Sequence, residues 1–114
     1  MKELKIKQGE KMNNLSVKAQ KAIKLEYKDV EVLTPADLLK HNLRVDYAQK
    51  IYSHKNDKEY LLFYFYDLTE EKRIKCFVGY NTALAKDFKY NDTYGITVVI
   101  VEQKNEKGTF YLFE

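Results

Sequence analysis

The segment EYLLFYFYD, which runs from Glu59 to Asp67, limits the possible folds of this chain more than any other. A run so rich in aromatic residues is typical of a β-strand. Because successive side chains of a strand point to opposite faces, both faces of this strand carry apolar area. A single-layer sheet would leave one of these faces exposed, and large exposed apolar patches are usually covered by a partner. The sequence therefore predicts a strand within a sheet and a homodimer that forms through that sheet.

Two β-hairpins are expected in the C-terminal half of the chain. The first joins this strand, through a turn over residues 67–72, to RIKCFVGY, in which alternate residues share one face: Ile74, Cys76, Val78 and Tyr80. A short helix, TALAKDF, should follow with Asn81 as its cap. The second hairpin should pair ITVVIV with TFYLF around the turn EQKNEKG.

The stretch TPADLLKHNLRVDYAQKIYSHK, residues 34–55, is predicted to form two short helices joined by a tight turn. Thr34–Pro35 suits the start of the first, because threonine caps a helix and proline fits its first position. Asp46 can cap the second helix, in which Ala48 and Ile51 follow at helical spacing. This pattern is typical of a helix-turn-helix.

The order of the expected elements extends this prediction to the whole chain. An amphipathic helix with a basic face and a short β-prone segment, Val30–Val32, come before the helix pair, and a hairpin follows it. That order is typical of a winged helix-turn-helix. We therefore expect an α+β fold, a winged helix-turn-helix with an added C-terminal β-hairpin, as a single domain over residues 13–114 after a flexible arm over residues 1–12.

Positive charge is concentrated in the first half of the chain. Residues 1–58 hold 13 Lys and Arg against 8 Asp and Glu, whereas residues 59–114 hold 7 against 9. A one-sided positive field attracts a phosphate backbone, although exposed lysines also serve solubility alone. The charge distribution therefore permits nucleic-acid binding without establishing it.

The second helix of the pair carries the first group of candidate DNA contacts. If Ala48 and Ile51 face inward, the outward side chains would read base edges in the major groove or grip phosphate. The alternative is a solvated helix of an unrelated α+β domain. The candidates on this helix and at its ends are Arg44, Tyr47, Gln49, Lys50, Ser53 and Lys55.

Either hairpin could act as the wing, since basic and amide side chains on a hairpin can enter a groove. The alternative for each is an ordinary exposed turn. Core packing is the main role expected for the ten Tyr and six Phe, with stacking on unpaired bases as the alternative. The candidate wing residues are Lys72, Arg73 and Lys75 in the first hairpin and Gln103, Lys104, Asn105 and Lys107 in the second.

Catalysis, metals and cofactors are not expected. His41 and His54 are the only histidines and Cys76 the only cysteine, so the spacing of a metal site with three or four ligands is missing. Cys76 falls in the apolar phase of a strand, which favours a buried structural thiol over a nucleophile. Its cysteine usage fits a cytoplasmic protein, and no apolar run is long enough for a transmembrane helix.

The residues LLKHNLRVDY, from Leu38 to Tyr47, resemble the winged helix-turn-helix superfamily. Leu38–Leu39, Leu43–Val45 and Tyr47 are similar to the helix-turn-helix in the gamma domains of FtsK-type DNA translocases. The size, the composition rich in Lys, Asn and Tyr, and the element order also resemble the small accessory DNA-binding proteins of clostridial conjugative plasmids. The second resemblance implies a dimer that binds repeats at an origin of transfer, as part of a relaxosome.

These features together predict a sequence-specific double-stranded DNA-binding protein of a mobile element, an accessory protein of a relaxosome with no catalytic activity. Its expected partners are double-stranded DNA, a second copy of the chain and a relaxase. Two alternatives remain open. One is a transcriptional repressor that binds an operator, and the other is a protein-interaction module, such as a phage inhibitor of a host enzyme, that does not bind DNA.

Overall fold

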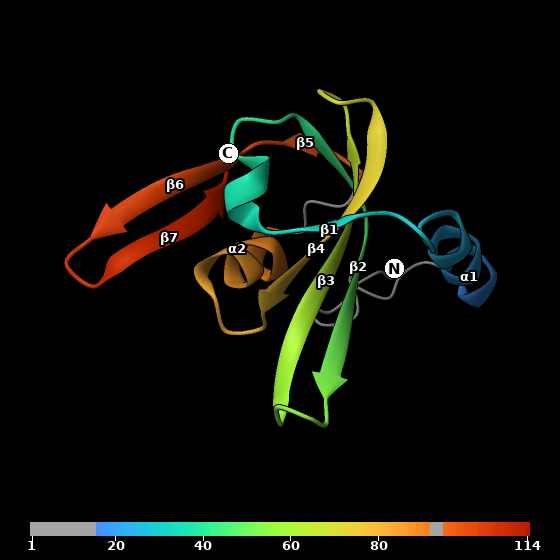
Figure 1. Cartoon of the computed structure of the whole chain (residues 1–114), viewed down its shortest axis with the longest axis horizontal. Coiled ribbons are helices and arrows are strands. Elements are labelled where there is room, and N and C mark those ends of the chain that lie inside the picture. Colours follow the sequence, from blue (N-terminus) through green and yellow to red (C-terminus); the bar gives the residue numbers. More distant parts are fainter. Residues whose placement is uncertain (1–15, 92–94) are drawn as a thin grey trace, which may run out of the picture.

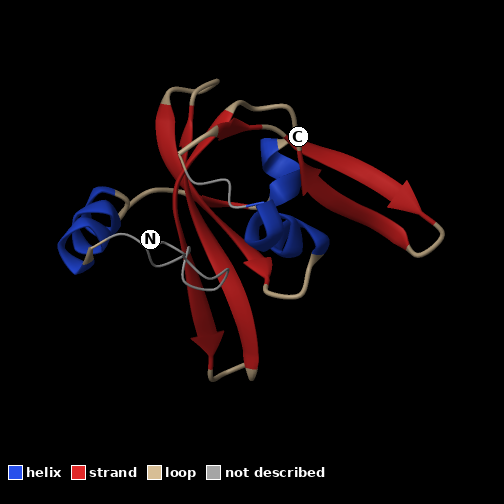
Figure 2. Cartoon of the chain, turned by 180° about the vertical axis from the view of Figure 1, so that it is seen from behind, coloured by secondary structure: helices blue, strands red, loops and turns tan. Residues whose placement is uncertain are grey.

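The protein, seen as a computed structural model that describes residues 16–91 and 95–114, is built mostly from β-strands (Figures 1 and 2). The flexible arm expected over residues 1–12 lies outside the described residues. Within the described ranges, no helix is long and apolar enough to cross a membrane. The elements in chain order are α1 (Val17–Glu26), β1 (Val32–Leu33), the 3₁₀ helix η2 (Pro35–Leu38), β2 (Leu43–Ser53), β3 (Lys58–Asp67), β4 (Lys72–Gly79), α2 (Ala83–Asn91), β5 (Thr97–Val98), β6 (Ile100–Asn105) and β7 (Gly108–Phe113).

Five of the strands form one curled sheet in the order β1-β4-β3-β2-β5. Strands β2, β3 and β4 are an antiparallel meander, β5 returns to pair with the start of β2, and β1 pairs parallel with β4. Strands β6 and β7 form a separate hairpin that projects from the sheet (Figure 1). Helix α2 lies between this hairpin and the sheet, whereas α1 lies on the opposite side of the molecule (Figures 1 and 2).

The main core fills the inside of the curled sheet. Leu61, Phe63 and Phe65 point inward from β3 and are completely buried. The Phe63 ring stacks on Phe65 at 5.0 Å and meets Phe88 of α2 edge to face at 5.1 Å, a favourable geometry for aromatic pairs. The inward face of the aromatic strand is therefore covered by the chain itself.

A second, smaller cluster covers part of the outer face of the sheet. Tyr47, Leu62 and Tyr64 are buried there together with Tyr27, the residue that ends α1. Ile23 of α1 packs against the same cluster. Both faces of the middle of β3 are thus covered within one chain, which removes the argument for a dimer through this sheet. The dimer itself stays a prediction.

The winged helix-turn-helix prediction is wrong. The expected first helix of the pair is only the four-residue η2, and the expected reading helix is β2 and the turn that follows it. β2 pairs with β3 from Leu43–Asp67 to Ser53–Lys58. The physical reason is that a strand buried on both faces must pair its backbone N–H and C=O groups along both edges: β4 supplies one set of partners and β2 the other. The fold is a mostly β, curled mixed sheet with a hairpin, not an α+β domain with three helices and a wing.

A β-bulge interrupts the alternation of β2. Val45 pairs with Phe65 and Tyr47 with Tyr64, so Asp46 is an extra residue in the strand. Val45 and Ala48 consequently point into the core although three positions separate them. The helix prediction rested instead on the three-residue spacing of Ala48 and Ile51. In the structure these two residues lie on opposite faces of β2, Ala48 in the main core and Ile51 against the small cluster.

Several local predictions are confirmed. β3 pairs with β4, as the first hairpin requires. The second hairpin is confirmed only in part: β6 pairs with β7, but only Ile100 and Val101 of ITVVIV lie in β6, and residues 102–105, which were expected in the turn, belong to the strand. Thr34 caps η2, with Asp37 completing the capping box and Pro35 at the start. The helix expected after residue 81 is α2, although Thr82, not Asn81, accepts the hydrogen bond from the Ala85 amide.

Cys76 is buried on β4, as its place in the apolar phase of the strand predicted. Burial raises the pKa of its thiol to about 12. The thiolate is the nucleophilic form of cysteine, so this side chain is poorly suited to covalent catalysis.

Candidate functional site

The exposed part of the outer face lies on β3 and β4 next to the small cluster. Tyr60 and Phe77 both point outward there, since Phe77 stands opposite the outward-facing Leu62 in the ladder. Their rings meet edge to face with centroids 6.2 Å apart. Phe77 is 42% exposed, so an aromatic ring in the middle of a strand is open to solvent. The contact between two aromatic rings on this face, and not the exposure of one side chain, makes it a candidate binding surface.

Three cations share this face with the two rings. Lys58 precedes Tyr60 by two positions on β3, and Arg73 and Lys75 precede Phe77 on β4 at the same alternation, so all five project to one side. Lys58 and Arg73 are exposed and Lys75 is half-buried. None of the three forms an ion pair with another residue of the described ranges. We call Lys58, Tyr60, Arg73, Lys75 and Phe77 the outer platform.

Asp46 is the only carboxylate among the described outward residues of β2, β3 and β4, and it is neutralised. Arg44 Nε lies 2.6 Å from its Oδ1, and the Tyr27 hydroxyl donates to its Oδ2 at 2.6 Å. Burial, and then the bond to Asp46, raises the pKa of Tyr27, so the hydroxyl stays protonated as a donor. The outer platform is therefore positive without an opposing free carboxylate, which suits an anionic ligand.

The candidates predicted on the reading helix are scattered along β2 instead. Tyr47 is buried within the small cluster, so its side chain is not accessible to a macromolecule. Gln49 accepts a hydrogen bond from the Tyr64 hydroxyl at 3.0 Å. Arg44 donates a hydrogen bond to Asp46, and its guanidinium lies 5.0 Å from the centre of the Tyr66 ring.

The remaining candidates on β2 lie away from the outer platform. Lys50 projects to the other face, where it forms an ion pair with Glu59 at 3.1 Å. Ser53 ends β2, and its hydroxyl accepts from the Asn56 amide in the turn. Lys55 is exposed in that turn, at the tip of the β2–β3 hairpin.

The wing candidates are divided between two places. Arg73 and Lys75 lie on the outer platform, whereas Lys72 begins β4 and pairs with Glu31 at 3.2 Å. The other four are exposed residues of the projecting β6–β7 hairpin: Gln103, Lys104, Asn105 and Lys107. The structure therefore brings together only two of the thirteen predicted residues on the outer platform.

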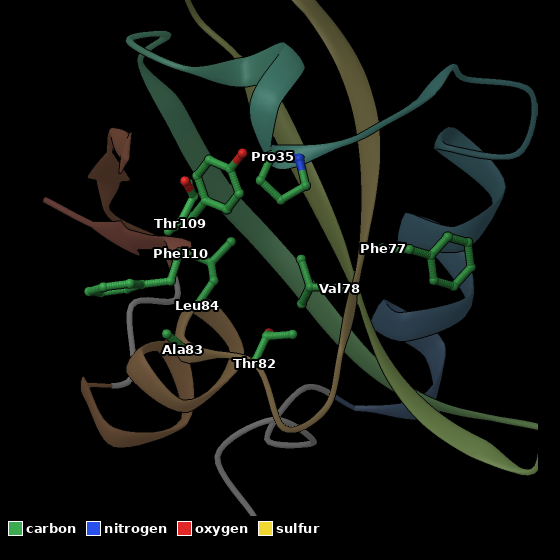
Figure 3. Close-up of a pocket in the computed structure, with 9 residues that line it drawn as sticks. Pro35, Phe77, Val78, Thr82, Ala83, Leu84, Thr109 and Phe110 are labelled. Atoms are coloured by element: carbon green, nitrogen blue, oxygen red, sulfur yellow. The ribbon is translucent and has the colours of Figure 1, made fainter. Parts of the chain in front are cut away.

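An apolar hollow of about 400 Å³ lies behind the outer platform, between β4, α2 and β7 (Figure 3). Pro35, Leu84 and Phe110 are among its lining residues. Phe77 borders it as well, but in Figure 3 its ring points away from Leu84 and Phe110. Phe77 therefore presents its ring to the outer face.

Sequence reasoning missed Lys58, Tyr60 and Phe77 as site residues. A signal for Phe77 was present, because the alternation that places Cys76 and Val78 inside also places Phe77 outside. Tyr60 carried no such signal, since the sequence does not show which of the aromatic residues of β3 the chain covers.

Among residues 16–91 and 95–114, no group of three or more His, Cys, Asp or Glu side chains could hold a metal ion. No protein-family model matches the chain, and neither a curated protein nor a solved structure matches it significantly.

Proposed function

We propose that this protein binds single-stranded nucleic acid on the outer platform. The observation that carries the proposal is the Tyr60–Phe77 pair, of which Phe77 is exposed and Tyr60 half-buried, flanked on the same face by three cations without ion pairs. Single-strand binders stack bases on aromatic rings and hold the backbone with basic side chains. Unpaired bases offer their faces for such stacking, whereas a duplex keeps them within its own stack.

The connectivity of the sheet adds support by analogy. A three-strand meander, a helix and three further strands, of which β5 returns beside the start of the meander, is similar to the strand order of the OB-fold if β5 and β6 together correspond to its fourth strand. OB-folds bind oligonucleotides on the strands that correspond to β3 and β4 and on the loops that correspond to the β2–β3 and β6–β7 turns. The likeness is partial, because β4 pairs with β1 where an OB-fold pairs it with its last strand.

The proposal changes the nucleic acid expected from the sequence. The prediction of double-stranded DNA binding depended on a reading helix. The residues expected to form that helix form β2 and the turn after it instead. The roles at an origin of transfer or at an operator stay predictions, and a duplex competitor in the binding assay tests them together with the proposal.

The first test is the binding of a fluorescent oligothymidylate of about 12 nucleotides, the scale of an OB-fold site. We expect the single strand to bind and an equal duplex to compete poorly. Phe77→Ala should weaken binding by about 1–3 kcal/mol, or about 5- to 150-fold, because it removes one stacking surface. Fluorescence anisotropy measures both effects.

The matched control for Phe77→Ala is Leu68→Ala, which shortens another exposed apolar side chain outside the outer platform. Equal affinity of Phe77→Ala and wild type would refute the platform.

The second test is the salt dependence of the same affinity. Three phosphate contacts predict a slope of log affinity against log salt of about −2, from about −0.7 per contact on a single strand. Lys75→Gln should make this slope less negative by about 0.7 because one contact is lost. Lys40→Gln, an exposed lysine away from the outer platform, should leave it unchanged. A slope near zero for the wild type would remove the electrostatic part of the proposal.

A further inference from the structure

The apolar hollow behind the outer platform continues into a second hollow along β7. The second hollow, of about 310 Å³, shares Ala83, Thr109 and Phe110 with the first. In Figure 3, Thr109 and Phe110 lie on one side of the first hollow and Val78 of β4 lies on the other. The two hollows thus form one groove between β7, β4 and the start of α2, which we call the edge groove.

One edge of β7 carries main-chain groups without a strand partner. The amides of Val99 and Glu114 each donate to the other residue's carbonyl oxygen, at 3.1 and 2.7 Å, which fixes the hydrogen-bond alternation of the β6–β7 ladder. By that alternation Phe110 bonds to β6, whereas the N–H and C=O groups of Thr109 and Tyr111 point away from β6. In the part of the chain that the structure describes, β6 is the only strand that pairs with β7.

This open edge of β7 faces α2 and the edge groove. The Phe113 amide, the next one along the same edge, donates to Asp87 of α2 at 2.9 Å, and residues 109–111 line the groove. The opposite wall is a sheet edge as well. β1 pairs with β4 only at Lys75–Cys76, so the rest of β4, including Val78, has no strand on that side within the described ranges. A groove between two open sheet edges offers main-chain bonding groups to one extended strand.

Lys107 is the only charged residue that lines the edge groove. It lies at the tip of the β6–β7 hairpin, is exposed, and forms no ion pair with another residue of the described ranges. The first hollow, in contrast, has apolar walls that include Pro35, Val78 and Leu84. Positive charge at one end of the groove and apolar area at the other are complementary to a segment that is both apolar and acidic.

We propose that the edge groove binds an extended, acidic peptide segment of a partner protein by β-strand addition. The main-chain groups of Thr109 and Tyr111 pair with the peptide backbone, an apolar side chain enters the first hollow, and a carboxylate reaches Lys107. Because Lys107 and Tyr111 are four positions apart, the apolar and acidic residues of an antiparallel peptide should be about four positions apart as well. This surface goes beyond nucleic-acid binding and does not rest on it.

The first experiment is water-exchange NMR of the ¹⁵N-labelled protein without a partner. We expect the amides of Thr109 and Tyr111 to exchange fast, and those of Phe110 and Leu112, which bond to β6, to exchange slowly. Protection of the Thr109 and Tyr111 amides would overturn the proposal, because the edge would already be covered. Protection that disappears on dilution would identify a second copy of the chain as the cover, and protection that persists would identify another segment of the same chain.

The second experiment adds three capped octapeptides of alternating threonine and valine. In each, one valine position is the anchor, occupied by valine, leucine or phenylalanine, and a glutamate stands four positions after it. We expect at least one probe to shift the amide signals of Ala83, Thr109 and Tyr111. With that probe at about ten times its Kd, the Thr109 and Tyr111 amides should exchange about tenfold more slowly, because they are open only in the unbound protein. No shift with any probe at millimolar concentration, or shifts without this protection, would overturn strand addition.

A double-mutant cycle tests the charge contact. Lys107→Gln should weaken binding of the glutamate probe about twofold to fivefold, the scale of an exposed ion pair. A probe with glutamine in place of glutamate should lose the same factor, and it should bind the wild type and Lys107→Gln equally well. Lys40→Gln, which removes an exposed lysine that does not line the groove, is the matched control. Two losses that multiply independently would overturn the contact between the carboxylate and Lys107.

Discussion

Replacement of Phe63 by alanine is expected to lower the free energy of unfolding by about 3–5 kcal/mol, the usual range for a buried phenylalanine. Phe63 is completely buried where β3, α2 and β7 meet. Its ring contacts Phe65, Phe88 and Phe113 at centroid distances of 5.0, 5.1 and 5.5 Å. Alanine would leave a cavity between rigid elements that cannot close around it, and domains of this kind are stable by only about 5–15 kcal/mol.

Urea denaturation followed by circular dichroism measures this loss, and Phe77→Ala is the matched control. Phe77 is also an aromatic residue of the β3–β4 ladder, but it lies half in solvent. We expect this control to cost less, about 1–2 kcal/mol, since a substantial part of the side chain already lies in solvent. Comparable losses in the two variants would mean that Phe77 is part of the core, and the outer platform would lose its exposed ring.

Replacement of Asp67 by alanine should lower the free energy of unfolding by about 1–3 kcal/mol for each buried group that loses its acceptor. Asp67 is the buried carboxylate at the end of β3. Its Oδ1 accepts from the amides of Thr69 and Glu70 at 3.0 and 3.1 Å, and its Oδ2 lies 2.7 Å from His41 Nδ1. Alanine would leave all three groups without this acceptor.

The variant Asp67→Asn separates the contribution of the bonds to the turn amides from that of the contact with His41. The asparagine oxygen can still accept from the turn amides, whereas the charge opposite His41 is lost, so the loss of stability should be smaller than with alanine. The same urea titration gives the comparison. An alanine variant within about 1 kcal/mol of wild type would show that water satisfies these groups just as well.

The parts of the fold that sequence reasoning predicted correctly are those in which neighbouring residues decide the structure. The β3–β4 and β6–β7 hairpins join consecutive strands, and Thr34 with Pro35 starts a helical turn by local bonds. The second neighbour of β3 could not be predicted in this way. Residues 43–53 are a strand because they pair with β3 along its whole length, and residue propensities predict a strand poorly where such tertiary pairing determines the structure.

The candidate site was predictable only in part, for a related reason. Arg73 and Lys75 follow from alternation on β4, because the inward phase of that strand is clear in the sequence. The exposure of Tyr60 depends instead on where α1 stops covering the sheet. Helix α1 has no buried residue of its own, so its sequence gives little indication of which tyrosines it hides.

The bulge at Asp46 means that β2 carries one residue more than the ladder requires. A shortened β2 without that position would keep Val45 and Ala48 inside and Tyr47 outside, in plain alternation. β3 has no extra residue of this kind, because its pairing with β4 runs without interruption. Deletion of one residue from β3 would turn the inward side chains on one side of the deletion to the outer face. We therefore expect a one-residue deletion to be tolerated better in β2 than in β3. Deletion of Asp46 would remove the hydrogen bond from the Tyr27 hydroxyl, which joins the end of α1 to β2.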